Sequence, residues 1–262
     1  MKKSLAMDLQ GQTILITGAA GRIGSSIAKA ALEANAIVLI SDISKHRLGN
    51  IHKELSNDFG AKVHVIVADA STANGIDQLI EKSLSKTGRI DGAVHAAYPI
   101  SEGWGTSFED LKEENLHQNL IMQLGGAILF SQKILSCFKR QSSGNLVHLS
   151  SIQGVQAPKF DHYVGTNMNS PVEYTAIKSG IIGITKWLAK YHPSQSIRVN
   201  CVSPGGIIDN QPESFLQKYR ASCTNIGMLS AKDVAKAVVF LLSPSANAIN
   251  GQNLIIDDGW TL

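Results

Sequence analysis

The sequence predicts an α/β fold, a single doubly wound parallel sheet of about seven strands with helices on both faces. Short β-branched runs alternate with longer helical patterns along all 262 residues. Strand–helix–strand order repeated in this way implies right-handed crossovers. The strand runs are apolar almost throughout, which is typical of a sheet buried on both faces. With 44% hydrophobic and 17% charged residues and no internal repeat or linker, the chain is expected to form one domain over residues 1–262.

Each expected element follows from a local pattern. A helix from about Ile23 to Asn35 follows the first strand, and a polar amphipathic helix separates the second and third strands. A later helix, YTAIKSGIIGITKWLAKY (174–191), is apolar on more than one narrow stripe, so it needs the sheet and a second partner. The expected strands are TILIT (13–17), AIVLIS (36–41), KVHVIVA (62–68), IDGAVHAA (90–97), NLVHLSS (145–151), IRVNCVS (197–203) and NLIID (253–257).

Composition argues against several functions. A net charge of +3 is too small and too scattered to indicate a nucleic-acid partner. Cys137, Cys201 and Cys223 show no metal-ligand spacing and indicate free thiols in a reducing compartment. The start, MKKSLAMDLQGQ, has no apolar segment of signal-peptide type, and runs such as AVVFLL are too short to cross a bilayer. We therefore expect a cytoplasmic protein with no membrane partner and no metal.

A glycine-rich turn, TGAAGRIG (17–24), joins the first strand to the first helix. Gly18, Gly21 and Gly24 supply a tight turn, close backbone approach to a ligand and close helix packing. The free N–H groups and positive dipole of the helix then face a phosphate. This position in the first βα turn predicts nucleotide binding.

Acidic residues end the next two strands. Asp42 is near the spacing at which a carboxylate binds the adenosine ribose hydroxyls and repels a 2′-phosphate, which favours NAD over NADP. Arg22, Lys45 and Arg47 are placed to serve a phosphate instead, and Asp42 could simply cap the following helix. Asp69 is placed either to meet the adenine edge or to cap the next helix.

Tyr174 and Lys178 are four residues apart in the apolar helix, so they lie on one helix face. Alone, this spacing is also that of two ordinary neighbours. In order along the chain, however, the glycine turn and this pair resemble the short-chain dehydrogenase/reductase family, which has a Rossmann-like fold. GNLVHLSSIQG (144–154), HQNLIMQLGGAILF (117–130), IRVNCVSPGG (197–206) and GQNLIIDDGW (251–260) are similar to four further motifs of that family.

The resemblance implies the roles of the site residues. Tyr174 would be the general acid/base, with its pKa lowered by two to three units by Lys178, which would also hold the nicotinamide ribose. Ser151 would orient the substrate oxygen, and Asn119 would hold a relay water; the alternatives are a turn serine and an exposed helix polar residue. The cofactor-binding positions implied are Gly18, Gly21, Arg22, Ile23, Gly24, Asp42, Asp69, Ala70, Ala96, Tyr174, Lys178, Pro204, Gly205 and Ile207.

The chain departs from the family pattern twice. Arg22 stands where the short form has its middle glycine, a spacing seen more in sugar-nucleotide members. HAAY (95–98) stands where N-N-A-G is common, which leaves His95 without a role.

Two segments are expected to form the substrate site, at about 155–173 and 205–229. The first is longer than in short-form relatives, and long loops beside a site are usually functional. Its aromatic and polar groups predict a hydroxylated, sugar-like substrate, an amino sugar or sugar phosphate; the alternative is that it braces a subunit interface. The residues named for contact are Phe160, Asp161, His162, Tyr163, Asn167 and Asn169, facing Asp209, Asn210, Gln211, Glu213 and Arg220.

The function expected is interconversion of a secondary alcohol and a ketone with NAD(P), on a small polar substrate. Likeness to dehydrogenases associated with flagellin modification and surface-polysaccharide synthesis points to that metabolism. A sugar-nucleotide epimerase or dehydratase and a cofactor-sensing regulator are the competing classes. Because relatives commonly pair the helix that carries Tyr174, a homodimer or homotetramer is expected.

Overall fold

The computed structural model describes residues 7–191 and 196–262. The N-terminal segment, for which we expect no signal peptide, lies partly outside the described residues. All seven strands belong to one parallel sheet, as predicted, and their order in the sheet is β3-β2-β1-β4-β5-β6-β7. The strands are β1 Thr13–Thr17, β2 Ile37–Asp42, β3 Val63–Val67, β4 Gly92–His95, β5 Ser143–Leu149, β6 Ser196–Pro204 and β7 Asn253–Ile256.

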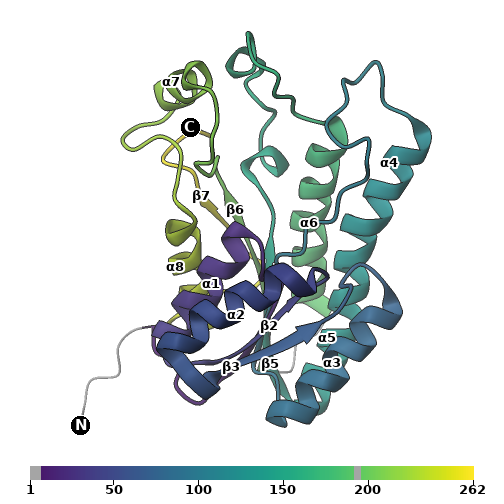
Figure 1. Ribbon diagram of the computed structural model, residues 1–262, viewed down its shortest axis with the longest axis vertical. Helices are drawn as coiled ribbons and strands as arrows, with labels where there is room; N and C mark the ends of the chain where they lie inside the picture. Colours follow the sequence, from purple (N-terminus) through teal and green to yellow (C-terminus); the bar gives the residue numbers. More distant parts are fainter. Residues whose placement is uncertain (1–6, 192–195) are drawn as a thin grey trace.

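Helices cover both faces of the sheet (Figure 1). Helix α1 packs against α8 on one face, and α3 packs against α5 on the other. The helices are α1 Arg22–Glu33, α2 Lys45–Phe59, α3 Ala73–Thr87, α4 Glu113–Asn119, α5 Gly126–Gln141, α6 Val172–Tyr191, α7 Glu213–Ala221 and α8 Ala231–Leu242.

Strands β1 to β6 each contribute to two hydrophobic cores, and the edge strand β7 contributes to one of them. In β1, Ile14 and Ile16 belong to the core shared with α1 and α8, whereas Leu15 belongs to the core shared with α3 and α5. Successive side chains of a strand point to opposite faces, so a strand covered on both faces must be apolar at every position. This is why the strand runs do not alternate.

The longest helical stretch runs from α4 through the π-helix η2 (Leu120–Gly125) into α5. Within the described part of the chain, Glu113–Gln141 is the one helix long and apolar enough to cross a membrane by length and composition, with 44% of its most apolar window buried in the fold. Phe130, Ile134 and Phe138 of α5 are fully buried in the core beneath the sheet. The apolar character of the stretch therefore serves packing of a core helix.

The chain order reverses between β1 and β4, and such a switch point creates a crevice at the carboxyl ends of the strands. The segments that follow β5 and β6 project from the same end of the molecule, where helix α7 lies above the sheet (Figure 1). The fold therefore places the glycine turn, the serine turn and both long loops around one edge.

Candidate active site

The glycine turn after β1 is held tightly against the loop after β4. Gly18 has φ +65°, and a Cβ there would collide with the Ala96 carbonyl. A Cβ on Gly24, in the first turn of α1, would collide with the Gly18 carbonyl. These two positions therefore require glycine, and the turn directs the N-terminus of α1 toward the crevice.

A groove runs across this edge of the sheet as two cavities that share Gly18, Gly21, Ala96, Ala97 and Tyr98. One cavity, of about 530 Å³, is lined by Asp42, Asp69 and Ala70. The other, of about 330 Å³, is lined by Ile23, Tyr174, Lys178 and Ile207. A continuous groove with a glycine turn at its centre suits an extended dinucleotide whose phosphates meet the turn. Pro204 and Gly205 lie on the neighbouring cavity described below.

Asp42 is buried at the end of β2 and is held by backbone N–H groups. Its carboxylate accepts from Ser44 (3.0 Å) and Ala20 (3.2 Å). The N-cap of α2 is Ser44, whose hydroxyl accepts from the Arg47 N–H, so Asp42 is not itself the cap. Likewise Thr72 caps α3, and Asp69 instead binds the Ser71 N–H at 2.9 Å. Both carboxylates line the groove.

The arginines that could attract a 2′-phosphate are already paired. Arg22 forms an ion pair with Asp209 and donates to the Ile208 carbonyl (3.2 Å). Arg47 lies 3.7 Å from the Asp42 carboxylate. The Arg22 contacts also join the glycine turn to the 205–229 segment.

Three of the predicted catalytic side chains meet where the groove ends. Ser151, directly after β5, hydrogen bonds to the Tyr174 phenol, and Tyr174 lies in the first turn of α6. Lys178, one helical turn later, is buried; its Nζ donates to the Leu149 carbonyl (3.0 Å) and lies 5.4 Å from the Tyr174 ring centroid. The i, i+4 spacing does bring phenol and ammonium together.

The pKa lowering predicted for Tyr174 is wrong for this structure. Burial raises the pKa of the phenol, and the hydrogen bond with Ser151 offsets only part of that effect. The reason is the direction of Lys178, whose ammonium hydrogen bonds to a backbone carbonyl. Burial also lowers the pKa of Lys178 from 10.5 to about 8. The protein alone therefore favours a protonated phenol beside a lysine that titrates close to neutrality.

Asn119 lies apart from this trio and is fully buried at the end of α4, just before the π-helix. Its Oδ1 accepts from the Ser101 N–H (2.9 Å), and its Nδ2 donates to the Glu173 carboxylate (3.3 Å). Glu173, next to Tyr174, is only 2% exposed. No sequence pattern pointed to Glu173, which ties α6 to α4 beside Tyr174.

We expect Glu173→Leu to destabilise the protein by about 1–3 kcal/mol, because it leaves the buried Asn119 amide without its acceptor. Since α6 carries Tyr174, kcat should fall as well. Glu173→Gln restores an acceptor oxygen and should recover most of both losses. Urea denaturation and steady-state kinetics of the two variants test this, and equal stability of the leucine variant and the wild type would contradict it.

The HAAY departure acquires a structural explanation. The buried His95 ring hydrogen bonds to the Thr17 hydroxyl (3.1 Å) and stacks on Phe130, so it joins β4 to β1 and α5. Tyr98 lines the groove; its ring meets Tyr174 edge-on at 5.9 Å and lies 5.3 Å from Lys178 Nζ. Trp104 packs edge-on against both tyrosines. Position 98 thus adds an aromatic wall beside Tyr174 and Lys178.

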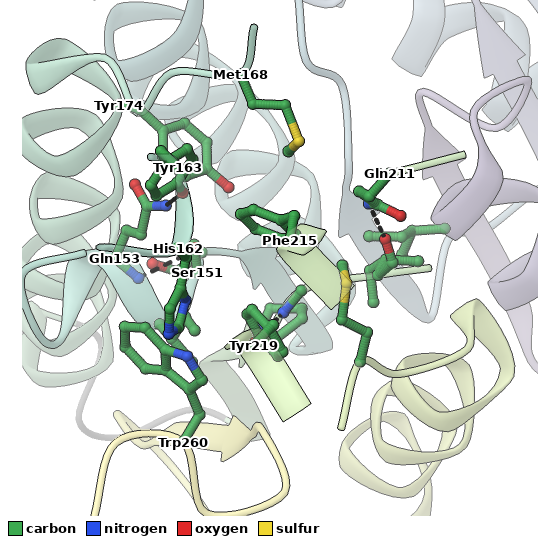
Figure 2. A pocket seen from close by; sticks show the side chains of 18 residues that line it. Ser151, Gln153, His162, Tyr163, Met168, Tyr174, Gln211, Phe215, Tyr219 and Trp260 are labelled. Carbon is green, nitrogen blue, oxygen red and sulfur yellow. Dashed lines mark hydrogen bonds between the residues drawn. The ribbon is translucent and has the colours of Figure 1, made fainter. Parts of the chain in front are cut away.

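Beyond Tyr174 lies a third cavity of about 250 Å³, which we call the aromatic pocket (Figure 2). In Figure 2 Tyr174 lies at the upper left of the view, Trp260 lies toward the bottom, and Phe215 and Tyr219 lie nearer the centre. Phe215, Tyr219 and Trp260 belong to one hydrophobic cluster with Ile152. The described lining residues are Ile23, Ser150, Ser151, Ile152, Gln153, His162, Tyr163, Met168, Tyr174, Pro204, Gly205, Gly206, Ile207, Gln211, Phe215, Tyr219, Met228 and Trp260.

Of the loop residues named from the sequence, only His162, Tyr163 and Gln211 line this pocket. The expected pocket contacts of the others are wrong, because their side chains are exposed or bound elsewhere. Asn169 donates to the Thr106 carbonyl (2.9 Å), and Arg220 donates to the Ile226 carbonyl (3.3 Å). The remaining exposed residues are Phe160, Asp161, Asn167, Asp209, Asn210 and Glu213.

Comparison with known proteins agrees with this geometry. The family model described as enoyl-(acyl carrier protein) reductase matches residues 18–261. Post-translational flagellin modification protein A of Campylobacter coli is 40% identical over 97% of this chain and 100% of its own. The 3-oxoacyl-[acyl-carrier-protein] reductase FabG of Thermotoga maritima is 31% identical over 97% and 99%.

Among solved structures, a short-chain dehydrogenase from Leptospira borgpetersenii with bound NAD⁺ matches with a TM-score of 0.87 at 31% identity, over 100% of this chain and 97% of that one. The match extends from the glycine turn to the last strand, so it includes every element that forms the groove. The chain belongs to the short-chain dehydrogenase/reductase family and is an oxidoreductase with a nicotinamide cofactor.

Proposed function

We propose that this protein interconverts a secondary alcohol and a ketone on a polar, sugar-like substrate, in surface-glycan or flagellin-modification metabolism. One observation carries the proposal: Tyr174 lines both the cofactor groove and the aromatic pocket. The phenol is therefore within reach of two ligands at once. The 40% identity to a flagellin modification protein supports the metabolic setting.

The residues around Tyr174 have distinct roles in this proposal. When bound, the nicotinamide supplies the hydride acceptor or donor, and the protein handles the proton. Tyr174 Oη donates its proton to the carbonyl oxygen in reduction; in oxidation it accepts the alcohol proton after releasing its own to solvent. Ser151 hydrogen bonds to the same substrate oxygen and keeps it beside the phenol. Lys178 holds the ribose, and the side chain of Asn119 positions the adjoining helix end.

We propose NAD as the preferred cofactor. Asp42 places a carboxylate where the adenosine ribose would lie, and a carboxylate repels a 2′-phosphate. Arg22, which would favour that phosphate, is paired with Asp209. The NAD⁺ bound to the Leptospira relative is consistent with this preference.

Asp42→Ala is expected to weaken NAD⁺ binding and to strengthen NADP⁺ binding, narrowing the ratio of the two Kd values by about tenfold or more. The substitution removes the repulsive charge and releases Arg47 from its ion pair. Titration by fluorescence measures both affinities. Asp209→Asn is the matched comparison, because it releases Arg22 from its ion pair and leaves Asp42 in place. If the unmodified protein binds NADP(H) more tightly than NAD(H), the proposed preference for NAD is wrong.

Turnover assays decide the substrate class. A panel of neutral and charged sugar derivatives should be tested beside hydrophobic alcohols and ketones, in both directions, with NAD(H). We expect activity on the hydroxylated compounds. Activity confined to the hydrophobic set would overturn the sugar-like substrate and leave only the oxidoreductase assignment.

We also propose a homodimer or homotetramer. Ile121 and Ile128, on the η2–α5 stretch, are 67% and 47% exposed, and Trp187 on α6 is 60% exposed and stacked on Tyr191. Exposed apolar side chains on a helix favour a helix partner. Light scattering of the purified protein measures the state directly.

A further inference from the structure

The aromatic pocket carries no formal charge. None of the described residues that line it is Asp, Glu, Lys or Arg. His162 is neutral at pH 7, because burial, Lys159 and Lys218 lower the pKa of its imidazole more than Asp161 raises it. A phosphate or carboxylate buried there would lose its hydration without gaining an ion pair with any lining side chain, which is unfavourable.

A cationic ligand is no better accommodated. Aromatic rings attract cations, but the Trp260 ring already faces an ammonium, since Lys159 Nζ lies 4.7 Å from its centroid. Lys159 also donates to the Trp260 carbonyl (3.2 Å), which holds this charge on the tryptophan although Lys159 itself is not among the lining residues. A free amine in the pocket would therefore meet a like charge.

Hydrogen bonds within the pocket occupy side-chain acceptors and leave donors. Gln153 Oε1 accepts from Ser170 (2.6 Å), while its Nε2 donates to Tyr163 Oη (3.2 Å) and retains a second N–H. Tyr163 and Tyr219 each use the phenol oxygen as an acceptor, Tyr219 from the Gly206 N–H (2.6 Å), so their own hydrogens remain to be donated.

The same bias appears elsewhere on the wall. Gln211 Oε1 accepts from the Asp209 N–H (2.6 Å), and one of its two N–H groups donates to the Ile207 carbonyl (2.9 Å). The indole N–H of Trp260 is buried with no hydrogen-bond partner among the described residues. The pocket thus combines apolar ring faces with neutral donors, and its ideal ligand presents a neutral acceptor.

We propose, on the basis of the function proposed above, that the substrate part entering the aromatic pocket is an uncharged ring bearing an amide carbonyl, as in an N-acylated amino sugar. The amide oxygen accepts from the Gln153 and Tyr163 donors, and the apolar ring face lies against Phe215 or Tyr219. Phosphorylated and free-amine forms of the same sugar are excluded. Of the two substrate classes expected from the sequence, the proposal therefore selects the amino sugar over the sugar phosphate.

Three matched probes test the proposal on the intact protein saturated with NADH: N-acetylglucosamine, glucosamine and N-acetylglucosamine 6-phosphate. Isothermal titration should show the first binding about tenfold or more tightly than the other two. Equal or tighter binding of the phosphate or the amine overturns the proposal, as does no binding of all three. If neutral sugars are turned over equally well with and without the acyl group, this inference is overturned and the proposed function stands. If the enzyme turns over apolar ketones and no sugars, both this inference and the proposed sugar-like substrate are overturned.

Two variants identify the recognising groups. Gln153→Leu should weaken N-acetylglucosamine binding about tenfold and remove most of the preference for the acylated probe. Gln217→Leu makes the same chemical change on the exposed face of α7, outside the pocket, and should leave binding unchanged. Tyr163→Phe keeps the ring and removes the hydroxyl, so it tests the same site if the first variant does not fold. An unchanged preference in Gln153→Leu and Tyr163→Phe overturns the assignment.

Discussion

A Tyr174→Phe variant is expected to turn over roughly 10²–10⁴-fold more slowly than the wild type, with unchanged NAD(H) affinity. The substitution removes only the hydroxyl, and therefore the proton that the phenol exchanges with the substrate oxygen. The edge-on contacts of the ring with Tyr98 and Trp104 should survive, because both depend on the ring alone. Steady-state rates and cofactor titration measure the two effects separately.

Tyr191→Phe is the matched control for this experiment. Tyr191 lies on the same helix, is 62% exposed and stacks on Trp187, so its substitution should leave the rate unchanged. A Tyr174→Phe enzyme with more than about a tenth of the wild-type rate would show that another group transfers the proton, since such groups contribute at least ~10²-fold.

The sheet could be predicted from the sequence because each strand is a largely apolar run that does not alternate with polar residues. β1 begins and ends where TILIT does, and the other strands differ from the expected ranges by at most two residues at either end. The glycine turn was equally readable, since Gly18 and Gly24 are positions that no side chain could occupy. The pairing of Tyr174 with Lys178 followed from helix periodicity alone.

The directions of side chains could not be read in the same way. An acidic residue in the first turn of a helix, such as Glu173, is ordinarily an exposed partner of the helix dipole, and nothing local indicates that this one is buried against Asn119. In the 155–173 loop, Phe160 points to solvent while Tyr163 packs on Phe215, although both are aromatic. Trp260 reaches the pocket from the far end of the chain.

Lys178 shows the same limit in its electrostatics. Sequence spacing places the ammonium near the phenol, but the hydrogen bond to Leu149 and the burial of both groups decide their pKa values. A lysine whose pKa is lowered by burial is also a lysine that destabilises the fold. The site therefore exchanges some stability for function.

Lys178→Met is accordingly expected to abolish most turnover and weaken NAD(H) binding, yet to make the protein more stable at pH 7. The pKa of Lys178 is about 8 in the folded protein against 10.5 for a free side chain, so the unfolded chain binds its proton more tightly. The destabilisation caused by burying the charged Lys178 is therefore at its full value below pH 8. It decreases as the pH rises from about 8 to 10.5, so the free energy of unfolding increases over that range. Loss of the hydrogen bond to Leu149 offsets part of the gain, which leaves ~1–2 kcal/mol.

Thermal unfolding of the protein without cofactor at pH 7 and pH 10 measures this trade-off. The methionine variant should melt a few degrees higher at pH 7, at roughly 2–4 °C for each kcal/mol, and the difference should shrink or reverse at pH 10. Lys186→Met is the control, because Lys186 lies exposed on the same helix and its ammonium group remains hydrated in the folded protein. A Lys178→Met variant that is less stable at pH 7 would mean that the bond to Leu149 outweighs the burial of the charge, and that this lysine supports the fold as well as the reaction.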